Sequence, residues 1–339
     1  MNSQQKFLVG LAAGAAAAFA GSRLRRRARA IDFAGRVVVI TGGSRGLGLV
    51  LARRLAAEGA RLCLLARDES ELRRAAEQFP PGVDVMPLRC DIRRRGDVRA
   101  AIDTVLDRWH VIDILINNAG VIQVGPLEHM TEQDFENAMA THFWGPLHLM
   151  FEAVPSMRQR GFGRIVNIAS IGGRVAVPHL APYSASKFAL VGLSDAVRSE
   201  LDQYGIRVTT VTPGLMRTGS PRNADVKGRH EAEYAWFAIS DSLPALSASA
   251  ETAARQIVEA CRYGDPELTI TIAAKVAMVA DAFMPGVVAH TMMLANRVLP
   301  GVNGATGDER RRGAESTSKW APSAATVLTD KAAVVNNEV

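Results

Sequence analysis

Tyr183 and Lys187 lie four residues apart, a spacing that places two side chains on one face of a helix. A free phenol has a pKa of about 10, which is poorly suited to proton transfer near neutrality. A nearby ammonium group favours the phenolate, so we expect Lys187 to lower the pKa of Tyr183. The pair is therefore a candidate general acid and base.

Ser170 ends a predicted strand thirteen residues before Tyr183. Open α/β folds bind ligands at the carboxyl edge of the sheet, where such a hydroxyl can hydrogen-bond a substrate oxygen. Reduction of a carbonyl needs a hydride on carbon and a proton on oxygen. Ser170, Tyr183 and Lys187 could handle the oxygen and its proton, whereas the hydride requires a cofactor.

A glycine-rich loop follows the first predicted strand and opens a predicted helix that extends to about Glu58. Glycines let a backbone approach a pyrophosphate, and the helix N-terminus offers unpaired N–H groups and the positive end of the helix dipole. The alternative is an ordinary tight turn. The loop residues assigned to cofactor binding are Thr41, Gly42, Ser44, Arg45, Gly46, Leu47 and Gly48.

The end of the second predicted strand indicates which dinucleotide fits. An acidic residue there would bind a ribose 2′-hydroxyl, but this chain has Ala66 followed by Arg67. Arg67 and Arg45 suit a 2′-phosphate, because guanidinium groups pair phosphate through two parallel hydrogen bonds. We therefore predict NADP(H) as the cofactor; the alternative is that one or both arginines are solvated surface charges.

The elements that must position these residues alternate between short apolar runs and helical patterns. The runs lack strict polar alternation, so both faces of the sheet should be buried. With right-handed crossovers this predicts an α/β fold, a doubly wound, Rossmann-like parallel sheet of about seven strands with helices on both faces. The predicted strands are 37–41, 61–66, 83–90, 112–117, 164–170, 207–212 and 268–272.

These motifs, in this order, resemble those of the classical short-chain dehydrogenase/reductase family over roughly residues 33–275. The resemblance rests on the glycine loop, on Asn117-Asn118-Ala119-Gly120 after the fourth strand, on Ser170, and on Tyr183 with Lys187. It implies that Ser170, Tyr183 and Lys187 are catalytic, and that Tyr183 and Lys187 also contact the cofactor. Further cofactor-binding residues that it implies are Asp91, Ile92, Asn118, Ala119, Gly120, Pro213, Gly214 and Thr218.

One position departs from the family pattern. The family usually has an asparagine in the helix after the fourth strand, where it supports a water-linked proton relay, and here the alignment places His142. Histidine also donates and accepts hydrogen bonds and titrates near neutrality, so His142 is a candidate catalytic residue in a changed relay. The alternative is that it only packs.

The charge distribution argues against nucleic-acid binding. The chain has a formal net charge of +6, and residues 1–31 alone carry Lys6, five arginines between 23 and 29, and no acidic residue. The basic character thus belongs to an N-terminal arm and not to a face of the body. The three cysteines, Cys63, Cys90 and Cys261, are too few and too irregularly spaced for a metal site, so we predict buried thiols and no metal.

Four regions are expected: an arm (1–31), a catalytic domain (32–275), an apolar extension (276–300) and a mobile tail (301–339). The apolar run 7–20, followed by arginines, favours a membrane attachment with a cytoplasmic body; a soluble arm and a cleaved signal are the alternatives. Residues 219–250 are interpreted as a lid or a pair of short helices. Segment 269–300 is too interrupted for a spanning helix and predicts amphipathic helices that pack on the domain, on a second subunit or on a bilayer.

The sequence therefore predicts an NADP(H)-dependent oxidoreductase that interconverts a carbonyl and a secondary alcohol on a small-molecule, lipophilic substrate. A 3-oxoacyl thioester reductase and a non-catalytic dinucleotide-binding protein are the alternatives. The resemblance also implies a homo-oligomer. The enzyme interpretation requires the three catalytic side chains to face a crevice that is open to a dinucleotide.

Overall fold

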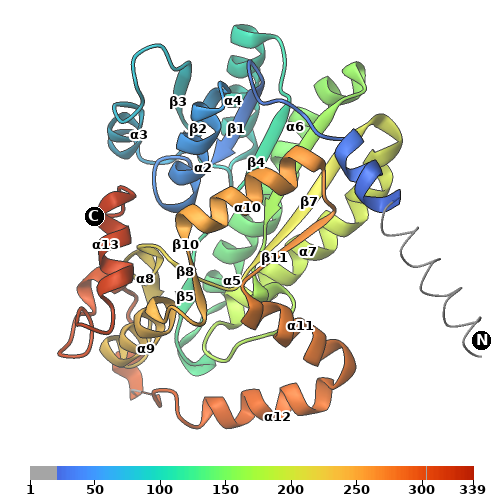
Figure 1. Ribbon diagram of the computed structural model, residues 1–339. Coiled ribbons are helices and arrows are strands. Elements are labelled where there is room, and N and C mark those ends of the chain that lie inside the picture. The colour runs from blue at the N-terminus through green and yellow to red at the C-terminus, as the bar shows by residue number, and fades with distance from the viewer. Residues whose placement is uncertain (1–20, 303) are drawn as a thin grey trace, which may run out of the picture.

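The computed structural model describes residues 21–302 and 304–339, and a seven-stranded parallel sheet with helices on both faces forms its centre (Figure 1). The strand order is β11-β7-β6-β4-β1-β2-β3. This confirms the predicted doubly wound fold, and each predicted strand is found within two residues of its expected bounds. The strands are β1 (Val37–Thr41), β2 (Arg61–Ala66), β3 (Val85–Arg89), β4 (Ile114–Asn117), β6 (Gly163–Ile168), β7 (Ile206–Pro213) and β11 (Glu267–Ile270).

Strand β1 shows why the strands read as continuous apolar runs. Val38 and Ile40 pack in one core with residues of α2 (Gly46–Ala57) and α10 (Ala250–Tyr263). Val37 and Val39 pack in a second core with residues of α4 (Arg95–Trp109) and α6 (Gly145–Arg160). Because successive side chains point to opposite faces, a strand covered on both sides must be apolar at every position.

The connection order places a switch point beside β1. This strand pairs with β2 on one side and with β4 on the other, because the chain crosses over β1 after β3. At such a point the loops after the two strands diverge and leave a crevice outside the carboxyl ends. The glycine loop and the N-terminus of α2 follow β1 directly, so they lie at this edge.

Segment 215–249 contains the helices predicted for it, together with short strands that the sequence pattern does not mark. Its elements are β8 (Leu215–Arg217), α8 (Ser220–Asn223), β9 (Asp225–Val226), α9 (His230–Ser242) and β10 (Ser247–Ser249). The carboxylate of Glu233 on α9 accepts hydrogen bonds from Trp236 Nε1 (2.6 Å) and pairs with His179 Nδ1 (2.8 Å). The contact with His179 anchors α9 against the loop that precedes α7 (Ala181–Leu201), the helix that carries Tyr183 and Lys187.

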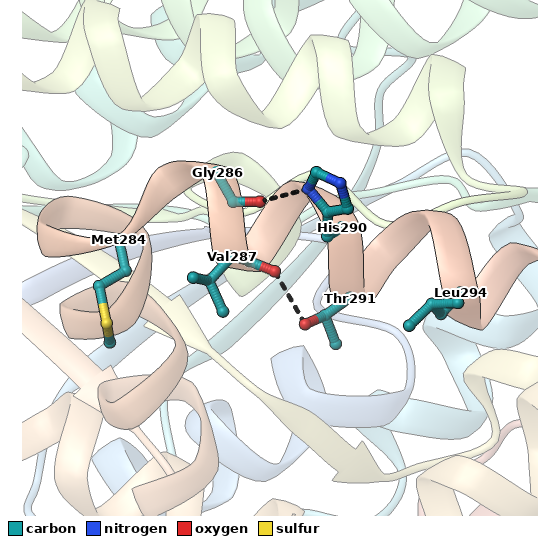
Figure 2. Close-up of a pocket in the computed structure, with 6 residues that line it drawn as sticks. All are labelled: Met284, Gly286, Val287, His290, Thr291 and Leu294. Atoms are coloured by element: carbon teal, nitrogen blue, oxygen red, sulfur yellow. Dashed lines mark hydrogen bonds between the residues drawn. The ribbon is translucent and has the colours of Figure 1, made fainter.

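The apolar segment after β11 forms two helices, α11 (Ile272–Phe283) and α12 (Pro285–Asn296), which extend from the body in Figure 1. No residue of α12 is buried. A shallow, largely apolar depression on α12 is lined by residues between Met284 and Leu294 (Figure 2). His290 and Thr291 there bond only to carbonyl groups one turn earlier, and none of the predicted site residues lines the depression.

Two terminal segments contact the body. Residues 21–28 are helical, and Arg26 pairs with Asp265 at 2.7 Å. Residues 304–339, for which the sequence predicts a mobile tail, form short elements that include β12 (Arg311–Arg312) and α13 (Val327–Val335). Strand β12 pairs with β9, and α13 contacts α9 and β8. In Figure 1 this C-terminal helix lies beside α8, on the side of the molecule that carries α2 and α3.

Among the described residues, no helix is both long and apolar enough to cross a bilayer. The apolar run 7–20 lies outside the described residues, so its membrane attachment stays a prediction. The three cysteines are buried and form no disulfide, as the sequence predicts.

Candidate active site

The structure brings Ser170, Tyr183 and Lys187 together at the carboxyl edge of the sheet. Ser170 follows β6, and its Oγ accepts a hydrogen bond from the Gly172 N–H (3.1 Å) at the start of a short 3₁₀ turn. Tyr183 and Lys187 lie on α7 (Ala181–Leu201). Burial raises the pKa of the Tyr183 phenol, and the neighbouring Ser170 hydroxyl acts in the opposite direction. Gly172 permits this approach, because a Cβ there would lie 3.2 Å from the Tyr183 ring.

Burial, however, dominates the pKa values of the pair and corrects one expectation. It raises the pKa of Tyr183 to about 12 and lowers the pKa of Lys187 to about 7. Lys187 Nζ donates to the carbonyl oxygen of Ile168 (2.8 Å) and lies 5.7 Å from the centre of the tyrosine ring. The pKa of Tyr183 is therefore above its usual value and not below it as predicted, because desolvation disfavours the charged form of both groups; a lowering by Lys187 requires its protonated form.

His142 occupies a turn of π-helix, Ala140–Trp144, and both of its ring nitrogens have partners inside the protein. Nε2 accepts the Val121 N–H (3.1 Å), and Nδ1 lies 2.7 Å from Ser186 Oγ, which donates to the Tyr183 carbonyl. Burial holds the pKa of His142 well below its usual value, so the ring is neutral. These contacts fit the packing alternative, with His142 holding the loop after β4 against α7.

Asp241 on α9 is a site residue that sequence reasoning missed. It is 5% exposed, and burial raises the pKa of its carboxyl well above the usual value. It is close enough to Tyr183 to raise the pKa of the phenol. Phe237, one turn earlier on the same helix, packs in a cluster with Tyr183. No pattern in the sequence marks Asp241, because α9 carries two other acids and serines flank Asp241 on both sides.

The glycine loop has the close backbone approaches that a phosphate cradle needs. Gly42 and Gly46 have φ angles of +63° and +55°, which favour glycine, and a Cβ on Gly48 would lie 2.1 Å from the Gly42 carbonyl oxygen. The hydroxyl of Thr41 accepts the N–H groups of Asn118 (2.9 Å) and Ala119 (3.0 Å). These bonds hold the loop after β1 against the loop after β4.

The arginines predicted to bind a 2′-phosphate form a cationic cluster beside the loop. Arg45 pairs with Glu71 on α3 (Glu69–Ala76) at 2.7 Å. Arg67 is partly desolvated, and burial together with the neighbouring cations Arg93 and Arg45 lowers its pKa. Asp91, expected at the adenine, accepts a two-pronged bond from Arg93. The cluster therefore has the charge that a phosphate requires, although Arg45 has an internal partner in this structure.

The remaining predicted residues surround the same edge of the sheet. Ile92 and Leu47 are buried, and Thr218, 2% exposed, donates to Ser220 Oγ (2.7 Å). Gly214 follows β7, where a Cβ would lie 2.3 Å from the Thr271 hydroxyl. Pro213 ends β7, and Gly214 and Thr218 follow it, so this segment lies at the same carboxyl edge of the sheet as the glycine loop.

The enzyme interpretation from the sequence requires an open crevice, but in this structure a segment of the chain itself occupies the crevice, which the sequence does not predict. The Gly46 N–H, at the start of α2, donates to the carbonyl oxygen of Asn336 (2.8 Å). The carboxylate of Glu338 accepts the Gly219 N–H (2.5 Å), and its Oε1 lies 3.0 Å from where a Gly46 Cβ would be. An acidic group therefore lies at the helix N-terminus, where a dinucleotide phosphate is expected to bind. The loop therefore accommodates an oxygen acceptor at the Gly46 N–H and a carboxyl group beside it.

Comparison with known proteins identifies the family. The family model for short chain dehydrogenase matches residues 36–227. The chain is 37% identical over 194 residues to a putative ketoacyl reductase of Streptomyces coelicolor, an alignment that covers 56% of this chain and 74% of that protein. It is 35% identical over 247 residues to dehydrogenase/reductase SDR family member 7B of Danio rerio, covering 70% and 77%.

Solved structures agree. A short-chain dehydrogenase from Streptomyces avermitilis superposes with a TM-score of 0.68 at 26% identity, over 79% of this chain and 99% of that one. A gluconate 5-dehydrogenase from Burkholderia cenocepacia, in complex with NADP and tartrate, gives 0.62 at 28% identity, over 72% and 96%. The chain belongs to the short-chain dehydrogenase/reductase family and is an oxidoreductase of that family.

The burial of Lys187 predicts a pH-dependent stability. Between a pKa of about 7 in the folded protein and the usual 10.5, the unfolded chain carries a proton on this amine that the folded chain does not. Stability contributed by this group therefore rises with pH across that window, by up to about 1.4 kcal/mol per pH unit. In Lys187→Met this contribution is absent. The free energy of unfolding of the variant in urea should therefore exceed that of the wild type most at pH 7, and the difference should shrink towards pH 10.

The exposed Lys275→Met controls for the loss of a surface charge. Equal pH slopes for the wild type and Lys187→Met would contradict the effect of burial on this amine.

Proposed function

We propose that the protein is an NADP(H)-dependent reductase or dehydrogenase that interconverts a carbonyl and a secondary alcohol, with Tyr183 as the general acid and base. The observation that supports it most is the convergence of Ser170, Tyr183 and Lys187 beside a glycine loop that accommodates an anion. A non-catalytic binding protein would have no need for this convergence.

In the proposed mechanism the nicotinamide supplies or accepts the hydride, and the chain handles the substrate oxygen. The Ser170 hydroxyl orients that oxygen, and Tyr183 donates a proton to it during reduction. With a pKa of about 12 the phenol is fully protonated near neutrality, but it releases its proton reluctantly. Protonation of Lys187, whose pKa is about 7, places a positive charge near the ring and favours the phenolate. Solvent or polar groups that reach Lys187 would promote this state.

The choice of NADP(H) over NAD(H) rests on the cationic cluster. Arg67 has three further arginines within electrostatic reach, Arg45, Arg93 and Arg312, and no acidic residue follows β2 at the position that binds a ribose hydroxyl. The related gluconate 5-dehydrogenase structure contains NADP. A 2′-phosphate would neutralise part of this cluster.

The substrate is proposed to be lipophilic, because Phe237 and Leu180 pack with Tyr183 in an apolar cluster. A 3-oxoacyl thioester is the second candidate, and the likeness to a putative ketoacyl reductase favours it. A panel of lipophilic ketones and 3-oxoacyl thioesters, with NADPH consumption as the readout, would separate the two.

Replacing the proposed acid gives the direct test of the mechanism. Tyr183→Phe should lower turnover with the best substrate of the panel by at least about 100-fold, because the proton donor is lost, while NADPH binding stays largely intact. Tyr204→Phe, at a half-buried tyrosine stacked on Arg158, is the matched control. Retained turnover in Tyr183→Phe would refute the role of Tyr183.

The cofactor assignment has its own test. In Arg67→Ala the ratio of kcat/KM for NADPH to that for NADH should fall by about tenfold or more, because a charge-assisted contact to the 2′-phosphate is lost. Arg61→Ala, at the exposed opposite end of β2, should leave the ratio unchanged. A wild-type enzyme that prefers NADH would overturn the assignment.

Membrane association from the cytoplasmic side is also proposed. Helices α11 and α12 expose apolar side chains, among them Ile272 (80%), Phe283 (82%) and Val287 (60%), with few charges between them. Such a surface suits the boundary between headgroups and acyl chains. A homo-oligomer stays a prediction from the resemblance.

Flotation of the full chain with phosphatidylcholine vesicles tests this contact. Phe283→Asp combined with Val287→Asp should reduce the floated fraction, because two carboxylates would enter the apolar face. Trp320→Asp, at a tryptophan that is 62% exposed elsewhere on the surface, should not. Wild-type protein that stays with the unbound fraction would contradict the proposal.

A further inference from the structure

The 336–338 segment bridges the two walls of the crevice in which the proposed cofactor binds. On one wall, the Asn336 carbonyl oxygen accepts the Gly46 N–H (2.8 Å). On the other, Glu338 Oε2 accepts the Gly219 N–H (2.5 Å). Asn336 is fully buried and Glu338 is 9% exposed, so the segment lies inside the crevice and not across its mouth.

Side chains on two helices hold the segment in place. Arg53 on α2 donates to the side-chain oxygen of Asn336 (3.2 Å) and to the Val335 carbonyl (3.0 Å). Asn337 donates to the Ser44 carbonyl (2.9 Å) and accepts from Arg74 Nε on α3 (3.2 Å). Asn337 also has a φ of +60°, a conformation that asparagine tolerates better than most residues. The segment is therefore bound by a specific set of contacts.

Neither the N-cap residue nor the first turn of α2 supplies an acidic or capping side chain. Its N-cap residue, Arg45, makes no side-chain capping bond, and the first turn contains no acidic residue. The ends of helices require acceptors for their first N–H groups, and the dipole favours a negative charge. Here the Asn336 carbonyl, contributed from nearly 300 residues away, accepts the Gly46 N–H, and the Glu338 carboxyl lies beside this end of the helix while it accepts the Gly219 N–H.

We propose that the 336–338 segment is an autoinhibitory element that occupies the phosphate subsite of the dinucleotide and must leave before NADP(H) binds. The Gly46 N–H has one hydrogen, so a phosphate oxygen and the Asn336 carbonyl compete for it. The ionised Glu338 carboxylate and a phosphate would repel each other in the same space. This inference rests on the proposed function, because it assumes that the crevice binds NADP(H).

Burial of the Glu338 carboxyl disfavours its charged form, and this cost weakens the hold on the bound segment, so a ligand can displace it. Burial raises the pKa of Glu338 to about 7, although the Gly219 N–H and Arg45 favour its ionised form. Arg45 is directed to Glu71 while the segment is bound, and a 2′-phosphate would offer it a second anionic partner. A ligand that supplies its own phosphates replaces the contacts of the segment and shifts the population to the open state.

The test is a titration of NADPH binding, by fluorescence or calorimetry, against the full chain and two variants. Removal of residues 336–339 should lower the dissociation constant by at least about tenfold, because binding no longer competes with closure. Glu338→Gln retains the shape but removes the charge and should lower it by a smaller factor. Glu309→Gln, at an exposed tail residue that pairs with Arg311, should leave it unchanged.

A peptide of residues 327–339 added to the shortened chain provides a second measurement. It should raise the apparent KM for NADPH without changing kcat at saturating NADPH. An affinity for NADPH that is unchanged or weaker in Glu338→Gln, or in a folded chain without residues 336–339, would overturn the autoinhibitory role. The proposed function would still stand in that case. Absence of NADPH binding in every form would instead remove the proposed function.

Discussion

The N–H groups at the start of α2 require an acceptor, and the rest of the site is arranged around that requirement. They follow β1 at the point where the strand order reverses, so the helix directs its positive end into the crevice beside the catalytic side chains. In this structure the Asn336 carbonyl accepts the Gly46 N–H, and the Glu338 carboxyl lies beside that end of the helix. The same electrostatics would bind the phosphates of a dinucleotide.

Desolvation also controls the pKa values of the buried groups around the carboxyl edge of the sheet. It raises the pKa of Tyr183, Asp241 and Glu338 and lowers that of Lys187, so each of these groups is shifted towards its neutral form. With a pKa of about 7, Lys187 is only partly protonated near neutrality, so it favours the phenolate less than a full positive charge would. Entry of polar ligands or solvent into the crevice would relieve this effect. The closed crevice and the shifted proton equilibria are thus consistent with a resting state.

The sequence predicts the sheet and the catalytic group well, because both depend on local patterns. Strand β1 is apolar at four successive positions since both of its faces are covered, and the four-residue spacing of Tyr183 and Lys187 fixes their common helical face. The pKa of Tyr183 could not be predicted, because it depends on how completely distant elements, such as α9 with Asp241, enclose the ring. The place of Glu338 could not be predicted either, because no local pattern marks a contact with a loop nearly 300 residues away.

The most direct test of this account is a crystal structure of the full chain with NADP⁺. The account predicts phosphate oxygens at the Gly46 N–H, a nicotinamide ring beside Tyr183 and Ser170, and Glu338 displaced from the Gly219 N–H. A structure in which Glu338 keeps its bond to Gly219 while NADP⁺ binds elsewhere, or with the phosphates away from the start of α2, would contradict it.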